Sequence, residues 1–358
     1  MTKSLHWRLK RRARRLRLAE REGRHEPSWG VAARIIFIVT VEAIPALELE
    51  VAGLSHLGQV RSVNEDAWAA ERVEDQVIAL VADGMGGHRA GEVASALATD
   101  TLISSFRTLL GTPYDRLARA FQRANLAVYQ QASRRVEARG MGTTLTCVLF
   151  DDQYLITGHV GDSRAYLLRE GELRQLTRDH SWVAERVRQG LILESEARTH
   201  RWRNVITNAL GSFPQVRLDL IGLELHSGDQ VMLCSDGLTG VLTDEQIARA
   251  ILNGANQPVG QVVEALVNQV NAGGAPDNVT VVLVRAIVVR PKPKSYTLPP
   301  PLEGARFATK DPHPDVTSTM VLEPESRAED PQNLPGWLIA ALITLAVSAV
   351  ALVVILLR

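Results

Sequence analysis

The sequence predicts an α+β fold in which antiparallel sheets are covered by helices. Between residues 50 and 289, short β-type runs follow one another in the chain, and longer helical patterns come mostly in pairs. A regular alternation of strand and helix would instead predict a parallel sheet. Hydrophobic residues make up 46% of the 358 residues, which supports a sizeable core and excludes a wholly disordered chain.

The expected strands are short apolar runs bounded by turn residues, at 77–82, 143–150, 154–160, 164–168, 218–223, 230–234 and 279–289. Glu170 and Gly171 predict a hairpin turn that returns through 173–176. The expected helices have apolar residues at helical spacing, at 90–110, 114–139, 182–189, 243–252 and 259–271. Thr243 and Gln246 fit a capping box, so one helix is expected to begin there.

Composition divides the chain into an N-terminal extension (1–49), a globular domain (50–289), a linker (290–335) and an apolar end (336–358). The first 24 residues hold ten lysines and arginines against two acids. They suit either a solvated basic arm or an amphipathic helix on an anionic surface. The apolar stretch 31–48 contains Glu42 and Pro45, so it is too short to span a membrane, and a signal peptide is a weaker alternative.

The C-terminal end predicts a membrane anchor behind a flexible spacer. Ten of the sixteen prolines lie in 290–335, which predicts an extended linker without its own core. Residues 337–357 carry no charge and no proline, and at ~1.5 Å per residue they can cross a bilayer core of ~30 Å. In the linker, Thr317 and Thr319 are open to two interpretations, an ordinary polar segment or phosphorylation sites.

The charge balance and the cysteine content exclude some classes of function. Forty lysines and arginines balance forty aspartates and glutamates, which argues against a protein that coats nucleic acid. The two cysteines, Cys147 and Cys234, both lie in apolar runs. They cannot form a disulfide framework or a cysteine-rich zinc site, so a reducing, cytosolic setting is expected for the domain.

Acidic residues stand where predicted strands end. Asp83 follows VIALVA, Asp162 follows ITGHVG, Asp236 follows VMLCS, and Asp277 precedes NVTVVLV, while Asp66 closes the segment RSVNED. Each Asp-Gly pair taken alone is more often a turn. However, the segments after Asp83-Gly84 and Asp236-Gly237 lead into helical patterns, which does not fit a hairpin. Strand ends on one side of a sheet share an edge, so these carboxylates can meet.

Clustered carboxylates without lysine partners repel one another and are tolerable when cations neutralise them. Oxygen ligands without cysteine or clustered histidine suit Mg²⁺ or Mn²⁺ rather than zinc. A carboxylate between two strand ends can bridge two ions ~3.5–4 Å apart, and the Gly84 carbonyl could add a ligand. Arg61 offers a planar fork that matches two phosphate oxygens. Together these groups indicate hydrolysis of a phosphoester.

The ordered motifs RSVNED, VADGMGGH, GMGTTL, VGDSRAY, LTRDHS, NALG, LCSDGL and DNVT resemble the metal-dependent 2C-type serine/threonine protein phosphatases in their bacterial form. The resemblance covers about residues 50–288. It implies a sandwich of two antiparallel β-sheets flanked by helix pairs (αββα), with a two-metal site at one edge. It also implies attack of a dimetal-bound hydroxide on phosphoserine or phosphothreonine.

By the same resemblance, Asp83 would bridge the two ions and Gly84 would add its carbonyl oxygen. Asp236 and Asp277 would hold the first ion, and Asp66 would serve the second directly or through water. Asp162 would help to bind a third, weaker ion, and Arg61 would bind the substrate phosphate. Residues 181–204 would form a mobile flap beside the site.

Two positions depart from the wider family pattern. Met85 stands where many members outside bacteria carry a histidine proposed as a general acid, although bacterial relatives commonly have methionine; His88 nearby fits a solvated loop histidine better. Gly240 stands where an acid is usual, so a third ion would lack one ligand. His159 and His180 are expected to be structural.

The expected function is therefore a phosphoprotein phosphatase, anchored by 336–358 with its catalytic domain on the cytoplasmic face. Its expected partners are phosphorylated proteins, among them membrane serine/threonine kinases and their substrates, and no nucleic acid. Two alternatives remain open at this stage: a phosphatase-like binding module without turnover, and a structural tether.

Overall fold

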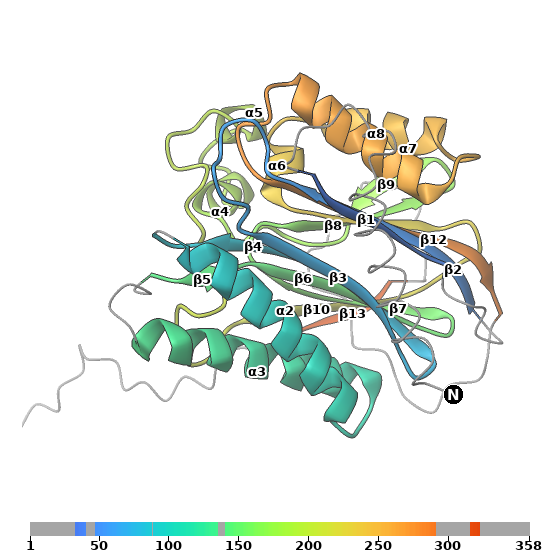
Figure 1. Cartoon of the computed structure of the whole chain (residues 1–358), viewed down its shortest axis with the longest axis horizontal. Coiled ribbons are helices and arrows are strands. Elements are labelled where there is room, and N and C mark those ends of the chain that lie inside the picture. The colour runs from blue at the N-terminus through green and yellow to red at the C-terminus, as the bar shows by residue number, and fades with distance from the viewer. Residues whose placement is uncertain (1–32, 41–46, 88, 135–139, 291–315, 323–358) are drawn as a thin grey trace, which may run out of the picture. The chain divides into compact units, whose positions relative to one another are not determined.

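The computed structural model describes residues 33–40, 47–87, 89–134, 140–290 and 316–322. Across these residues the strands form two antiparallel sheets (Figure 1). The first sheet has the order β1-β2-β12-β11-β8-β9, and the second has the order β13-β10-β7-β6-β4-β3, with β5 paired to β4.

The strands of the first sheet are β1 (Ala33–Thr40), β2 (Leu47–His56), β12 (Val279–Val289), β11 (Gln230–Cys234), β8 (Arg164–Arg169) and β9 (Glu172–Gln175). Those of the second are β13 (Val316–Leu322), β10 (Leu218–Glu224), β7 (Tyr154–Val160), β6 (Leu145–Asp151), β4 (Gln76–Met85), β3 (Asp66–Val73) and the short β5 (Gly142–Thr143).

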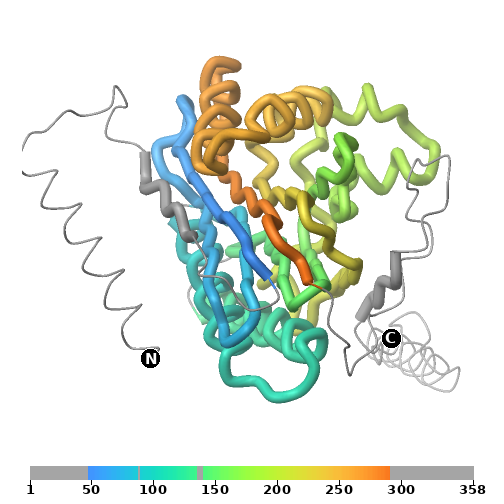
Figure 2. The backbone as a smooth tube through the Cα atoms, turned by 90° about the vertical axis from the view of Figure 1, so that its right-hand side faces the viewer, coloured from blue at the N-terminus to red at the C-terminus, as the bar shows by residue number. Residues whose placement is uncertain are grey.

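Pairs of helices cover the outer faces of the two sheets. Helices α2 (Ala90–Thr108) and α3 (Pro113–Arg134) lie over the second sheet, and α7 (Asp244–Asn253) and α8 (Val259–Ala272) lie over the first. Figure 2 shows the same layers from the side, with α8 above the strands and α2 and α3 below them. Three shorter helices, α4 (Trp182–Arg188), α5 (Glu194–Ala197) and α6 (Asp236–Thr239), complete the set in the described residues. The predicted αββα arrangement is confirmed.

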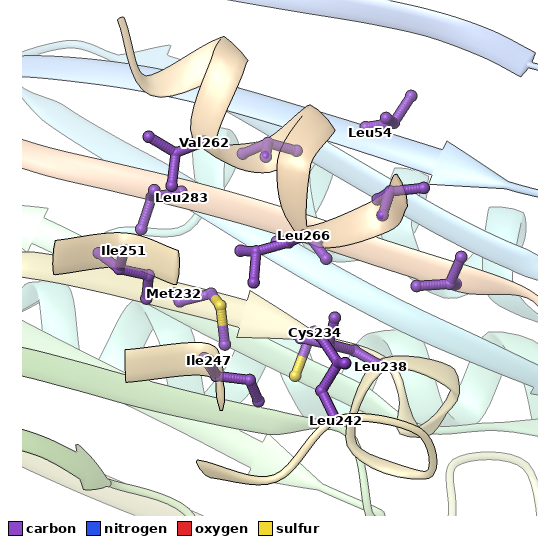
Figure 3. Close-up of a cluster of buried hydrophobic side chains, with 14 of the residues drawn as sticks. Leu54, Met232, Cys234, Leu238, Leu242, Ile247, Ile251, Val262, Leu266 and Leu283 are labelled. Carbon is purple, nitrogen blue, oxygen red and sulfur yellow. The ribbon is translucent and has the colours of Figure 1, made fainter. Parts of the chain in front are cut away.

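Alternation along β12 explains why its sequence is almost wholly apolar. Val282 and Val284 face the space between the sheets, whereas Val281 and Leu283 face α7 and α8. Successive side chains of a strand point to opposite faces, so a strand covered on both sides needs apolar residues throughout. Figure 3 shows the outer cluster, in which Leu283 lies with Met232, Cys234, Val262 and Leu266.

Several local predictions are confirmed. The strands at 154–160, 230–234 and 279–289 have the predicted bounds. Glu170 and Gly171 both have positive φ, as a two-residue hairpin between β8 and β9 requires. Thr243 and Gln246 form the predicted capping box, and α7 begins at the next residue.

The observed domain boundaries differ from those predicted from composition. β2 begins at Leu47, and β1 pairs with it, so the first sheet includes residues N-terminal to the expected boundary at 50. The segment 316–322, expected as part of an extended linker, forms strand β13. Strand β3 was not predicted, because DAWAAERV lacks a clear apolar alternation.

By its internal contacts the chain comprises two units, Met1–Val321 and Leu322–Arg358. The predicted membrane segment 337–357 and the basic N-terminal stretch both lie outside the described residues. In the part of the chain that is described, no helix has the length and apolar character needed to cross a bilayer.

Candidate functional site

Strand pairing brings the first two acids together. Asp66 opens β3 and Asp83 lies near the end of β4, and the antiparallel register places them directly opposite each other. The backbone of Asp83 is held on both sides. Its N–H donates to Thr144 Oγ1 at 2.8 Å, and its carbonyl accepts from Thr143 Oγ1 at 2.9 Å. Asp83 is therefore fixed by neighbouring strands rather than by a free loop.

The first sheet supplies the next two acids. Asp236 opens α6 directly after β11, and Asp277 lies just before β12. These segments are in close backbone contact, since a Cβ atom on Gly237 would lie 1.9 Å from the carbonyl oxygen of Asn278. Only glycine allows this approach, which brings Asp236 near Asp277.

Two hydroxyl groups connect Asp66 to the first sheet. Ser235 Oγ donates to Asp66 Oδ2 at 2.8 Å, and Thr280 Oγ1 donates to the same oxygen at 2.6 Å. The other oxygen, Oδ1, is buried and has no hydrogen-bond partner in the structure. One oxygen of Asp66 is thus used to join the two sheets, while the other is free for a ligand.

The carboxyl groups form one continuous cluster. Asp83 and Asp236 are close enough to shift each other's pKa, and Asp162 is close enough to both for their charges to interact. Asp162 is 8% exposed, and its Oδ1 atom is also buried without a partner. Asp277 interacts by charge with Asp66 and Asp236, so all five acids that the sequence singled out lie in one electrostatic neighbourhood. As they stand, no three acidic, histidine or cysteine side chains among the described residues are close enough together to hold a metal ion.

The electrostatics of this cluster are those of crowded, buried carboxylates. Burial, followed by the charges of Asp66 and Asp236, raises the pKa of Asp83 well above its usual range. Burial also raises the pKa of Asp162 and of Asp236, with further contributions from neighbouring carboxylates. The pKa of Asp66 rises to about 7, again mainly through burial, although its two hydroxyl donors oppose the rise. Such a cluster retains protons near neutral pH unless cations take their place.

Arg61 lies at the exposed side of the cluster. Its Nη2 atom donates to Asp277 Oδ2 at 2.7 Å, and its side chain is 46% exposed. The ion pair holds the guanidinium beside the carboxylates and leaves part of it open to solvent. This position suits the predicted contact with a substrate phosphate.

Sequence reasoning gave no role to Glu65. Its Oε1 atom is buried without a hydrogen-bond partner, and burial raises its pKa. Its place beside Asp66 in RSVNED was the available signal. Asn278 also has a role that was not predicted. Its amide accepts from the Glu65 N–H at 2.9 Å and donates to the carbonyl oxygens of Leu57 and Val63, which fixes the loop before β3.

The remaining sequence candidates occupy simpler places. Gly84 is packed against the start of α2, where a Cβ atom would lie 2.0 Å from the Gly91 carbonyl oxygen. Gly240 is the C-cap of α6. His88 lies outside the described residues. The flap range 181–204 contains α4, α5 and connecting turns.

The donor set fits hard divalent cations. The cluster offers only oxygen ligands, which is the preference of Mg²⁺ and Mn²⁺. Three of its carboxyl oxygens, in Glu65, Asp66 and Asp162, are buried without a hydrogen-bond partner. Buried polar atoms are normally paired, so these three oxygens are candidate ligands for a cation.

The sequence profile of the protein phosphatase 2C family matches residues 52–276, which contain the whole cluster except Asp277. The chain belongs to this family. It is 35% identical over 233 residues to the serine/threonine phosphatase Stp of Listeria monocytogenes, covering 63% of this chain and 92% of that protein. It is 40% identical over 245 residues to the serine/threonine protein phosphatase PstP of Mycobacterium tuberculosis, covering 67% of this chain and 46% of PstP.

Solved structures agree with this assignment. The catalytic domain of PstP in complex with two manganese ions superposes with a TM-score of 0.60 at 38% identity, covering 67% of this chain and 98% of that domain. The predicted enzyme class, a metal-dependent serine/threonine protein phosphatase, is confirmed. The predicted pair of Mg²⁺ or Mn²⁺ ions is confirmed for the family by the manganese complex.

Proposed function

We propose that this phosphatase acts on phosphoserine and phosphothreonine of proteins at the cytoplasmic face of a membrane, anchored there by residues 337–357. The observation that supports the catalytic part is the carboxylate cluster with its unpartnered buried oxygens. The apolar sequence of 337–357, behind a proline-rich linker, supports the anchor.

Each acid receives a ligand role from its place in the cluster. Asp83 lies between Asp66 and Asp236 and would bridge two cations, assisted by the Gly84 carbonyl oxygen. Asp236 and Asp277 would complete one ion site. Asp66, together with Glu65, would serve the other, because both side chains have an unpartnered buried oxygen.

Asp162 would contribute to a third, weaker site. It is near Asp236 and has an unpartnered oxygen, but Gly240 contributes no carboxylate there. Occupancy of this position would therefore depend strongly on Asp162 itself.

When bound, the two cations would acidify a water molecule and stabilise charge on the phosphoryl group. The residues of this chain supply the rest. Arg61 would bind two phosphate oxygens through its planar fork, and Asp277 orients that fork through the 2.7 Å ion pair. Ser235 and Thr280 hold Asp66 in one orientation, so the ligand set is arranged before any cation enters.

The catalytic proposal is tested with the purified full-length chain in detergent. Turnover of a phosphothreonine peptide should disappear in EDTA and return with excess Mn²⁺. Asp83→Asn and Asp236→Asn should each abolish turnover without unfolding the protein, whereas Asp152→Asn, a hairpin residue, should retain it. Activity that is indifferent to EDTA would refute the metal mechanism. Tight binding of the peptide without phosphate release would favour the binding-module alternative.

The anchor requires its own experiment. The full-length chain and a chain ending at residue 335 are expressed in the same cells, and membranes are washed with carbonate. We expect only the full-length protein to remain with the membranes, while both forms retain peptide phosphatase activity. Anchoring raises the effective concentration toward other membrane proteins, so membrane serine/threonine kinases and their substrates are the proposed partners. Equal release of both forms would refute the anchor.

A further inference from the structure

The loop that carries Asp162 depends on an unusual backbone position. Gly161 joins β7 to the residues before β8 and has a φ of +113°. A Cβ atom on Gly161 would lie 2.5 Å from Thr144 Cβ. The loop thus packs closely on Thr144, between β5 and β6, in a conformation that favours glycine, and the direction of Asp162 depends on what holds Gly161 in place.

His180 holds Gly161 from both sides. The His180 backbone N–H donates to the Gly161 carbonyl oxygen at 2.7 Å. The Gly161 N–H in turn donates to His180 Nδ1 at 3.1 Å. These two bonds involve the peptide groups before and after Gly161. The second of those groups includes the backbone nitrogen of Asp162, so a single residue fixes both peptide planes leading to the carboxylate.

The imidazole of His180 is itself held in one tautomer. Because Nδ1 accepts a hydrogen bond, the ring proton lies on Nε2, which donates to Asp219 Oδ2 at 3.2 Å. His180 is 1% exposed and Asp219 5% exposed. Burial alone would raise the pKa of Asp219, but the hydrogen bond and nearby charges lower it, so the carboxylate stays ionised. A buried carboxylate behind an imidazole fixes the ring proton and the ring orientation.

The residue after Asp162 is anchored toward the bridging acid. Ser163 Oγ lies 2.8 Å from Thr144 Oγ1, and that same oxygen accepts the Asp83 N–H. Both hydroxyl residues are fully buried. Asp162 therefore lies between two fixed neighbours, and its buried Oδ1 atom has no hydrogen-bond partner.

We propose that His180, oriented by Asp219, is a positioning residue that fixes the Gly161 peptides and thereby aims the Asp162 carboxylate at the cation cluster. This inference rests on the proposed ligand role of Asp162. His180 also belongs to the base of the flap, because its carbonyl oxygen accepts the Thr207 N–H at 2.8 Å. A displacement of the flap base would therefore reach Asp162 through one residue, His180, by its backbone and its side chain.

Two substitutions test the two ring nitrogens of His180 one at a time. His180→Asn places an amide oxygen near the Nδ1 position and can still accept the Gly161 N–H. His180→Gln reaches toward the Nε2 position and keeps the contact with Asp219, but it loses the acceptor for Gly161. His226→Gln, an exposed histidine, is the matched control.

The measurement is Mn²⁺ binding by the full-length protein, followed by electron paramagnetic resonance of the free ion, beside Mn²⁺ activation of phosphopeptide turnover. We expect His180→Gln to weaken the lowest-affinity Mn²⁺ step and to raise the activating Mn²⁺ concentration, each about tenfold. His180→Asn should keep Mn²⁺ affinity and Mn²⁺ activation close to those of the wild type, and His226→Gln should match the wild type in both. In an Asp162→Ala background, His180→Gln should change neither quantity by more than about twofold, since residues acting through one another are not additive.

The inference would be overturned if His180→Gln still weakened Mn²⁺ binding and Mn²⁺ activation about tenfold in the Asp162→Ala background. It would also be overturned if His180→Asn and His180→Gln weakened them equally. If the Gln variant does not fold, Asp219→Asn is judged by the same criteria in both backgrounds. A wild-type protein that binds no Mn²⁺ would instead contradict the proposed function itself.

Discussion

Replacing Asp66 with asparagine should stabilise the metal-free protein above neutral pH. In the folded state the pKa of Asp66 is raised from 3.8 to about 7, chiefly by burial. Well below pH 3.8 the group is protonated in both the folded and the unfolded chain, so it does not change the free energy of unfolding. As the pH rises toward 7, the unfolded chain releases its proton first, so the free energy of unfolding falls over this window and the penalty is complete above it.

The size of the effect follows from the same values. One pKa unit corresponds to about 1.4 kcal/mol, so a rise from 3.8 to about 7 corresponds to about 4 kcal/mol at pH 8. Although Oδ1 is buried, the residue as a whole is partly exposed and water screens some of this penalty, so we expect a gain of about 2 to 4 kcal/mol for Asp66→Asn. Asparagine Oδ1 can still accept the Ser235 and Thr280 hydroxyls, which keeps the sheets joined.

Urea unfolding in EDTA, followed by tryptophan fluorescence at pH 4 and pH 8, measures this directly. Asp75→Asn is the control, because that side chain is 82% exposed and should change the free energy of unfolding by less than about 0.5 kcal/mol. With saturating Mn²⁺ the wild type should become more stable to urea than Asp66→Asn, since the wild type gains binding energy that the variant loses. An asparagine variant no more stable than the wild type at pH 8 in EDTA would refute the reasoning.

Three further outcomes are expected. Gly237→Ala should destabilise the protein by about 2 kcal/mol or more and abolish turnover, because the new Cβ would collide with the Asn278 carbonyl oxygen; urea unfolding and phosphate release measure both. Thr144→Val should lower stability by about 1 to 3 kcal/mol by leaving the Asp83 N–H without its acceptor, while Thr144→Ser should not; equal losses in the two variants would contradict this. The two cysteines should react with a thiol reagent at pH 8 only after unfolding, since both are buried and burial raises the pKa of Cys234 to about 12; rapid labelling of the native protein would be the opposing result.

The sequence predicted the fold where apolar runs were bounded by clear turns, as at 154–160 and 230–234. It also predicted that Asp83, Asp162, Asp236 and Asp277 would gather, because these acids border predicted strands and strand ends share an edge. Asp66 was added by the family resemblance of RSVNED, since its strand β3 was not predicted. It could not predict how they are held. The bond from Thr280 to Asp66 joins residues 214 positions apart, and nothing local in either segment specifies that contact. The pair of hydrogen bonds between His180 and Gly161 is likewise a consequence of packing between segments. Glu65 was missed because strand β3, which begins at the next residue, was not predicted.

The position of β12 in the first sheet sets the order in which the centre can be assembled. This strand lies between β2 and β11, although it is the last strand of the domain before the linker. Until residues 277–289 have left the ribosome, β2 lacks its central neighbour and Asp66 lacks one of its two hydroxyl donors. A nascent chain therefore holds an incomplete cluster, and phosphatase activity arises only when synthesis of the domain is finished.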